Sequence, residues 1–166
     1  MNPIDLFIAE LEHEMTATMR QLEAIPAAKL EWQPHPKSMS IGKLGMHIAT
    51  IPGQICQMAT LDVFEFPENF GVPQPASKEE ILQAAAETIP QAKAALRSLT
   101  PAQITGDWTA KAKGHTLMTI PRMAMIRNIV CNHWYHHRGQ MQVYLRLLDV
   151  PVPSVYGPTA DVNPFM

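Results

Sequence analysis

The distribution of proline constrains the fold of this 166-residue chain more than any other feature, because the prolines cluster at three places. Proline lacks the backbone N–H of a helical hydrogen bond and disfavours helix at the residue before it. The clusters within residues 26–36, 67–75 and 151–164 therefore indicate loops and an extended C-terminal tail. Between them, apolar residues recur three and four positions apart, which is the spacing of one face of a helix.

Four long helices are expected from this spacing, over residues 3–25, 38–61, 77–99 and 119–148. The third begins with Ser77 and Glu80 at the spacing of a capping box, in which each side chain satisfies a backbone N–H of the first turn. Pro52 falls inside the second helix, where it removes the hydrogen bond to the carbonyl of Ile48 and predicts a kink.

The other stretches are interpreted as connections. Residues 101–118 contain Gly106 and Gly114 and are expected to form a long connection with a short helical turn. The Pro-rich tail is expected to be extended and to lie against the body. Without a convincing alternating strand pattern, the sequence predicts one all-α domain over residues 1–166, built as a four-helix bundle. The connection between the second and third helices is long enough for a non-sequential order, so the spacing leaves the topology open.

Composition and charge exclude several classes of protein. Apolar residues make up 46% of the chain and charged residues 17%, as in a folded globular domain. Thirteen basic and fifteen acidic side chains give a net charge of −2, without the basic patch that nucleic acid requires. There is no signal-peptide pattern and no apolar run of roughly 18 residues to span a membrane. We therefore expect a cytoplasmic protein with Cys56 and Cys131 as buried free thiols; a disulfide would need their helices to meet.

The histidines give the first indication of chemistry, because three of the seven fall within residues 132–140, NHWYHHRGQ. Random placement of seven histidines in such a chain would still give about 0.3 pairs at i,i+4 spacing, so a lone H-x-x-x-H is weak evidence. The position of the pair within its helix is more informative. Alternating steps of four and three residues define an inward-facing seam made of Ile126, Val130, His133, His137, Gln140, Tyr144 and Leu147.

Two imidazoles on a buried seam predict a metal site. They are costly as charged groups and need partners as neutral ones, and a metal ion accepts one nitrogen from each ring. His136 lies about 100° around the helix, which makes it a flanking residue that supports the site or is partly exposed; the less favoured alternative is that it is a ligand itself. Gln140 and Tyr144 face inward and are candidates to orient a substrate or a ligand. Arg138 is expected to project away from the seam and to make a structural or interfacial contact.

A catalytic metal usually has three protein ligands and one open position. His47 is the best candidate for the third ligand, because it lies close to the apolar face of the second helix, one turn before Pro52. The alternative is His13, which lies between two glutamates and has the pattern of a solvated face. His35 lies between prolines, and His115 lies in the long connection, from which it could reach the site as a mobile residue. Phe66, Phe70 and Trp108 are candidates for the walls of a pocket shaped by residues 65–76 and 101–118, although core packing suits Trp108 better.

The helix over residues 119–148 and the tail resemble a known family. The stretch NHWYHHRGQMQVYLRLLDVPVPSVYGPTAD is similar to the C-terminal signature of the DinB superfamily, and SIGKLGMHIATIPG resembles its second-helix motif, which carries one histidine. The resemblance implies a four-helix bundle of up-down-down-up topology that is often a homodimer. It also implies a three-histidine site at His47, His133 and His137, with nickel or zinc as the metal.

The resemblance further implies a metal-dependent enzyme acting on a small molecule. Some relatives are thiol-dependent transferases or isomerases that use bacillithiol, mycothiol or glutathione, and hydrolase chemistry is related. One alternative is a non-catalytic stress-response protein that binds a metal or a small ligand, and another is an interaction bundle without metal. No phosphate-binding loop, G-x-S-x-G elbow or H-E-x-x-H motif is present, and E-x-x-H occurs at only one place where a di-iron bundle needs two.

Overall fold

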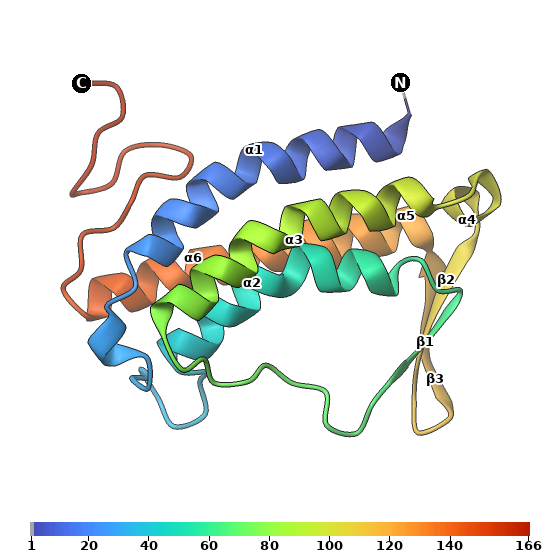
Figure 1. Ribbon diagram of the computed structural model, residues 1–166, viewed down its shortest axis with the longest axis horizontal. Helices are drawn as coiled ribbons and strands as arrows, with labels where there is room; N and C mark the ends of the chain where they lie inside the picture. Colours follow the sequence, from blue (N-terminus) through green and yellow to red (C-terminus); the bar gives the residue numbers. More distant parts are fainter. Residues whose placement is uncertain (1) are drawn as a thin grey trace.

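The computed structural model describes residues 2–166, and its body consists of long helices that lie side by side (Figure 1). They are α1 (Pro3–Glu23), α2 (Ile41–Met58), α3 (Lys78–Ser98) and a last helical stretch in three parts: α5 (Arg122–Met125), the π-helix η2 (Ile126–Asn132) and α6 (His133–Leu147). Two short elements, the 3-10 turn η1 (Ala27–Lys29) and α4 (Pro101–Thr105), lie in connections. These four long helical stretches match those expected from the apolar spacing.

The expectation of an all-α four-helix bundle with up-down-down-up topology is wrong, because the chain also forms a three-stranded sheet. The strands β1 (Val63–Phe66), β2 (Asp107–Ala112) and β3 (His115–Pro121) lie in that order at one end of the helices (Figure 1). β1 pairs in parallel with β2, and β2 pairs antiparallel with β3. The fold is therefore mixed, with helices and a small sheet, and residues 107–121 are a hairpin rather than a loop.

The hairpin turn shows why these strands form. Lys113 and Gly114 both have positive φ angles, of 50° and 76°, which suits the tight two-residue turn that joins twisted antiparallel strands. In β2, Trp108 and Ala110 alternate inward and are almost fully buried. In β3, six of the seven residues are exposed, so that strand lacks the alternation of apolar and polar residues by which a strand is recognised.

Arg122 fastens the sheet to the helices. Its side chain is 1% exposed and donates hydrogen bonds to the carboxylate of Asp62 and to four backbone carbonyl oxygens, those of Ala59, Leu61, Gln103 and Asp107. The last carbonyls of a helix have no N–H partner within the helix. The carbonyls of Ala59 and Leu61, which follow α2, likewise need a donor from elsewhere. One guanidinium thus satisfies the end of α2 and holds β2 beside it.

The predicted helix starts are largely confirmed. The Ser77 hydroxyl oxygen accepts a hydrogen bond from the N–H of Glu80, at 3.2 Å, as the N-cap of α3. The Glu80 carboxylate accepts from the N–H of Ala76, at 2.7 Å, so the reciprocal half of the capping box reaches one residue further back than expected. At α2, Ser40 is the N-cap and accepts from the N–H of Lys43.

Helix α2 continues through Pro52, and a side chain from another helix supplies the hydrogen-bond donor that proline lacks. The carbonyl of Ile48 would pair with the N–H of residue 52 in an uninterrupted helix. Instead, the indole N–H of Trp134 donates to that carbonyl at 2.9 Å, in a fully buried position. This contact joins α2 to α6.

We expect Trp134→Phe to lower the free energy of unfolding by about 2 kcal/mol, because the buried Ile48 carbonyl loses the indole donor. Pro52→Ala supplies a backbone N–H for the same carbonyl. In the Trp134→Phe background it should therefore stabilise the protein by roughly 1 kcal/mol more than it does in the wild type. Urea unfolding of the four proteins measures this difference, and equal effects of Pro52→Ala in both backgrounds would contradict the account.

The two cysteines and the tail behave as expected. Cys56 and Cys131 are buried free thiols, and burial raises the pKa of Cys131 to about 12. Residues 150–166 form neither helix nor strand. Asp161 accepts a hydrogen bond from Arg146, and the carbonyl of Ser154 accepts one from Arg20, which hold the tail to the helices. Among residues 2–166, no helix has the length and apolar character that crossing a bilayer demands.

Candidate metal centre

Three histidines from two helices converge at one point. His47 comes from α2, and His133 and His137 come from successive turns of α6. The Nε2 atom of His133 lies 3.3 Å from that of His47 and 2.8 Å from that of His137. All three potential ligand atoms lie within 4.8 Å of one another. The structure thus brings together the three histidines that the sequence singled out.

The hydrogen bond from Trp134 to Ile48 sets the relative depth of the two helices at this point. Trp134 follows His133 directly in the chain, and Ile48 follows His47. A buried donor and acceptor that each adjoin a histidine hold the two rings at the same level. The π-helix η2 ends immediately before His133. Its wider turns change the direction in which the following side chains point, and such turns are frequent at functional sites.

The same π-helix explains why the predicted seam is displaced. The buried stripe of α6 consists of Trp134, Arg138, Met141 and Leu145. His133, Gln140 and Tyr144 are half-buried along one edge of that stripe, and Leu147, expected inside, is 56% exposed. The prediction of which residues face inward was extended from Ile126 and Val130 at the spacing of an unbroken α-helix. A π-turn has more residues per turn, so the prediction fails beyond it. Nevertheless His137 is buried, and its ring points to the other two histidines.

The hydrogen bonds around the site favour a bound cation. His137 donates from Nδ1 to the side-chain oxygen of Gln140 at 2.7 Å, which leaves a lone pair on Nε2. That lone pair faces the Nε2 atom of His133. In a tetrahedral site with metal–nitrogen bonds of about 2.0–2.1 Å, neighbouring nitrogens lie about 3.3 Å apart. The two separations at His133, 3.3 and 2.8 Å, are close to this value, and all three nitrogens lie within 4.8 Å of one another, so together they could hold one divalent ion.

Of the three residues predicted to support the site, His136 and Gln140 are hydrogen-bonded to the histidine cluster and Tyr144 is not. The Gln140 amide nitrogen lies 3.0 Å from Nε2 of the exposed His136, so His136, Gln140 and His137 form a hydrogen-bonded chain that fixes the His137 ring. Tyr144 instead donates to the carbonyl of Met39, away from the histidine cluster. The remaining histidines are on the surface and outside the cluster: His13, His35 and His115.

Burial keeps the three rings neutral. Burial, together with the neighbouring His137 and His133, lowers the pKa of His47 to about 4. Burial also lowers the pKa of His133 and of His137. A metal binds only the unprotonated imidazole, so at neutral pH protons compete weakly with an ion for these nitrogens.

Comparison with known proteins agrees with this geometry. The family model of the DinB superfamily matches residues 10–141, which include all three histidines. The chain belongs to the DinB superfamily. It is 26% identical over 159 residues to the uncharacterized protein YrdA of Bacillus subtilis strain 168, covering 95% of this chain and 90% of that one.

Two solved DinB-like structures have the same fold. A DinB-like protein from Bacillus cereus ATCC 10987 superposes with a TM-score of 0.66 at 23% identity, covering 90% of this chain and 95% of its own. The DinB-like protein YjoA of Bacillus subtilis gives 0.68 at 19% identity, covering 90% and 97%. At these identities the likeness concerns the fold alone. The resemblance to the family that the sequence suggested is confirmed.

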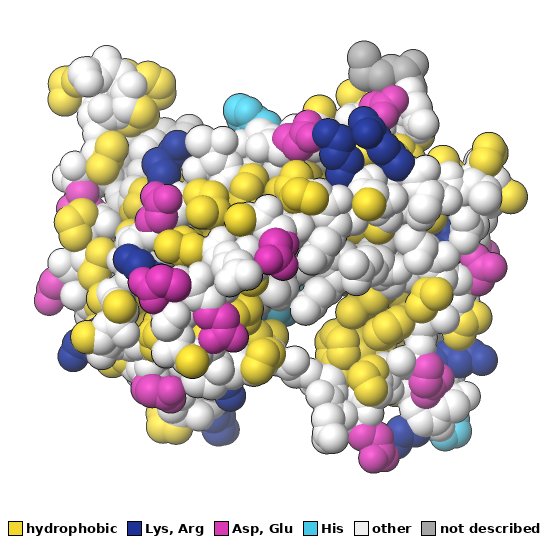
Figure 2. Space-filling model, viewed as in Figure 1, with side chains coloured by type: hydrophobic (Ala, Val, Ile, Leu, Met, Phe, Trp, Pro, Cys, Tyr) yellow, Lys and Arg dark blue, Asp and Glu magenta, His cyan; other side chains and the backbone are white. Residues whose placement is uncertain are grey.

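In this DinB chain a cavity of about 590 Å³ opens onto two of the three histidines, His47 and His133. Phe66, Phe70 and Trp108 line it, as expected of them, although Trp108 is also core: its indole N–H donates to the carbonyl of Met58. Figure 2 shows hydrophobic side chains gathered beside a hollow, between α2 and the sheet. The wall formed by Ala110 and Met118 could not be anticipated, because it belongs to the hairpin.

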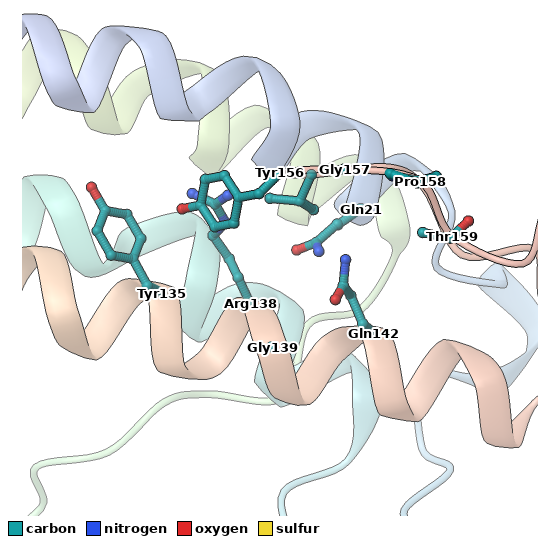
Figure 3. Close-up of a pocket in the computed structure, with 10 residues that line it drawn as sticks. Gln21, Tyr135, Arg138, Gly139, Gln142, Tyr156, Gly157, Pro158 and Thr159 are labelled. Carbon is teal, nitrogen blue, oxygen red and sulfur yellow. The ribbon is translucent and has the colours of Figure 1, made fainter. Parts of the chain in front are cut away.

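Arg138, expected to project away from the seam, is buried on the side of α6 that faces α1 and the tail (Figure 3). It donates to the Glu14 carboxylate at 2.6 Å, and its guanidinium lies near the rings of Tyr135 and Tyr156. It therefore joins three parts of the chain, and its role is structural as predicted. The cavity beside it, of about 400 Å³, is separate from the histidine cluster.

The metal-free DinB chain is expected to lose stability as the pH falls from about 6.5 toward 4. Unfolded histidine takes up a proton near pH 6.5, whereas folded His47 resists protonation until about pH 4. Over that interval the unfolded state binds more protons, so acid favours unfolding, and the full stability is present above it. Urea unfolding at pH 7.5 and 5.0, with chelator, measures the loss. The loss should be smaller in His47→Gln, and an equal loss in both proteins would contradict this assignment.

Proposed function

We propose that this protein is a metal-dependent enzyme in which His47, His133 and His137 bind one divalent ion. The observation that carries the proposal is the convergence of three neutral imidazole nitrogens at the end of an apolar cavity. Three protein ligands are the usual number at a catalytic metal, which keeps an open position for a small molecule. Imidazole donors suit both zinc and nickel, the two metals we propose.

The bound ion would supply Lewis acidity, lowering the pKa of a thiol or of a water molecule near it. The residues of the chain itself do the rest. Gln140 holds His137 in the tautomer that leaves Nε2 free, and His136 supports Gln140. The apolar walls keep bulk water away from the reacting groups, which strengthens electrostatic interactions there.

The reaction class we favour is transfer to a low-molecular-weight thiol. The thiolate sulfur forms a bond to an electrophilic carbon of the substrate, and the leaving group departs with the electrons of the bond that breaks. Hydrolysis by the same site is the related option, with water in place of the thiol. We also propose that the protein is a homodimer, which light scattering in solution tests.

The test is a thiol-transfer screen of untagged protein loaded with zinc or nickel. Bacillithiol, mycothiol and glutathione are each combined with an aryl chloride, and release of chloride is followed. We expect release with at least one thiol, with loss in His47→Ala and retention in the exposed His136→Ala. Activity unchanged in His47→Ala would contradict the proposal.

A non-catalytic metal- or ligand-binding protein is the second candidate, and one observation favours it. Among the described residues that line the cavity there is no aspartate or glutamate, so no carboxylate is available there as a general base. Chelation distinguishes the two functions. A large fall in melting temperature, together with no transfer or hydrolysis in any assay, would support the binding protein over the enzyme.

A further inference from the structure

We propose that the cavity beside the histidines binds an apolar small molecule that carries one negatively charged group, and that this is the substrate class of the protein. The identification of the ligand as a substrate rests on the proposed function. The binding itself rests only on the composition, size and charge of the cavity.

The walls of the cavity are apolar almost throughout. α2 contributes Ile51, Ile55 and Met58, and the last helical stretch contributes Met125 and Ile129. The remaining wall comes from the sheet and the loop after β1, with Phe66, Phe70, Val72, Trp108, Ala110 and Met118. A volume of about 590 Å³ lies in the range of cavities that enclose a drug-sized ligand. The hydrophobic effect therefore favours a ligand with an aromatic or branched aliphatic body.

Two features show that a ligand would improve the packing. Phe70 and Met118 are 54% and 42% exposed although both line the cavity, so apolar surface faces solvent there. Methionines also lie around it, at positions 39, 58, 118 and 125. Their unbranched thioether side chains adapt to ligands of different shape. A body of variable shape thus suits this cavity better than one exact molecule.

The charge at one end selects an anion. Lys43 lies one helical turn before His47, on the same face of α2, and lines the cavity. Within residues 2–166, no carboxylate lies at ion-pair distance from its ammonium group. Gln54 is the other polar wall residue besides the histidines. An anionic group at this end would meet an unpaired positive charge, whereas a cationic ligand would meet repulsion.

The test uses two fluorescent probes on metal-free, chelator-treated full-length protein. 8-Anilinonaphthalene-1-sulfonate is apolar with one negative charge, and N-phenyl-1-naphthylamine is a neutral compound of similar shape. We expect each to bind saturably at one site per chain, and decanoate to displace both.

Met118→Asp puts a charge into the apolar wall and should weaken both probes at least about 10-fold, because transferring a carboxylate from water into that wall is unfavourable. Leu117→Asp is the matched control, since Leu117 is the neighbouring exposed residue of β3 and does not line the cavity. It should leave both affinities within twofold. Ala110→Phe fills the cavity without adding charge and should also weaken both probes; circular dichroism checks the fold of each variant.

Lys43→Gln tests the charge. It should weaken the anionic probe about fivefold or more and leave the neutral probe within twofold, because only the anion interacts with the ammonium group. Equal loss of both probes would overturn the charge assignment. Binding unaffected by both Met118→Asp and Ala110→Phe would overturn the site itself.

Failure of this inference can be separated from failure of the proposed function. The probe titrations need no metal, and metal binding is measured independently on the same protein. Protein that binds the probes but no metal refutes the metal-dependent enzyme and retains the apolar anion site. Protein that binds metal but neither probe refutes the apolar anion site and retains the metal-dependent enzyme.

Discussion

Replacing His137 with alanine is expected to weaken the binding of Zn²⁺ or Ni²⁺ by at least about 100-fold. Substitution of a residue that only orients a metal ligand typically costs 10- to 100-fold in affinity, and loss of the ligand itself should cost more. The alanine variant retains two nitrogens, His47 and His133, whose Nε2 atoms are 3.3 Å apart. Two ligands hold an ion far less firmly than three, because solvent must supply the rest.

His136→Ala is the matched control for this experiment. His136 precedes His137 and is chemically identical, but it is exposed and outside the cluster. It hydrogen-bonds Gln140 and packs edge-on against the His137 ring but offers no nitrogen to the cluster, so its removal should reduce affinity by less than about 10-fold. Competition with a chromophoric chelator measures the affinity of each variant. Equal losses in His136→Ala and His137→Ala would show that histidine content, and not the geometry of the cluster, determines binding.

Replacing Arg122 with leucine is expected to lower the free energy of unfolding by about 4 kcal/mol. The side chain is almost fully buried and satisfies four backbone carbonyls and one carboxylate. Leucine fills part of the space but donates no hydrogen bond, and each carbonyl left unsatisfied in a buried position costs about 1–3 kcal/mol unless water reaches it. Because these carbonyls belong to the residues that follow α2, to α4 and to β2, the sheet should separate from the helices first.

Asp62→Asn provides the comparison, since it removes the charge of the solvent-exposed partner of Arg122 and leaves the buried guanidinium in place. The Asp62 side chain is 77% exposed, so its ion pair with Arg122 is largely solvated at that end. We expect a loss of less than about 1 kcal/mol. Guanidinium-chloride unfolding measures both variants. A similar small loss in Arg122→Leu would mean that the sheet is held by other contacts, such as that from Trp108 to Met58.

The helices could be predicted because their signals are local. Apolar residues at intervals of three and four mark α1, α2 and α3, and Ser77 caps α3 as its spacing to Glu80 predicts. Each signal involves residues that are close in the chain, and so it can be recognised without knowledge of the tertiary structure.

The sheet could not be predicted because its pairing is non-local and its edge is solvent-exposed. Val63 pairs in parallel with Thr109, and no short-range pattern relates two such strands. The one local indication was the dipeptide at Lys113 and Gly114, whose positive φ angles form the hairpin turn. Ala110 and Met118 line the cavity from this hairpin, so that wall could not be predicted either.

The candidate site was predicted better than the helix that bears it. His47, His133 and His137 were chosen from their spacing and their positions along the apolar faces, and they lie together. Yet the same phasing put Leu147 inside and Arg138 outside, the reverse of what the structure has. The π-helix η2 accounts for both outcomes: it displaces the side chains that follow, while the i,i+4 spacing of the histidine pair within α6 is unaffected.

The central claim is that three histidines of this chain bind one divalent metal ion. Elemental analysis of untagged protein, purified under metal-replete conditions and dialysed, tests it most directly. We predict close to one equivalent of zinc or nickel per chain, falling to background in His137→Ala while His136→Ala keeps the full amount. Wild-type protein with far less than one equivalent of any divalent metal would contradict the claim.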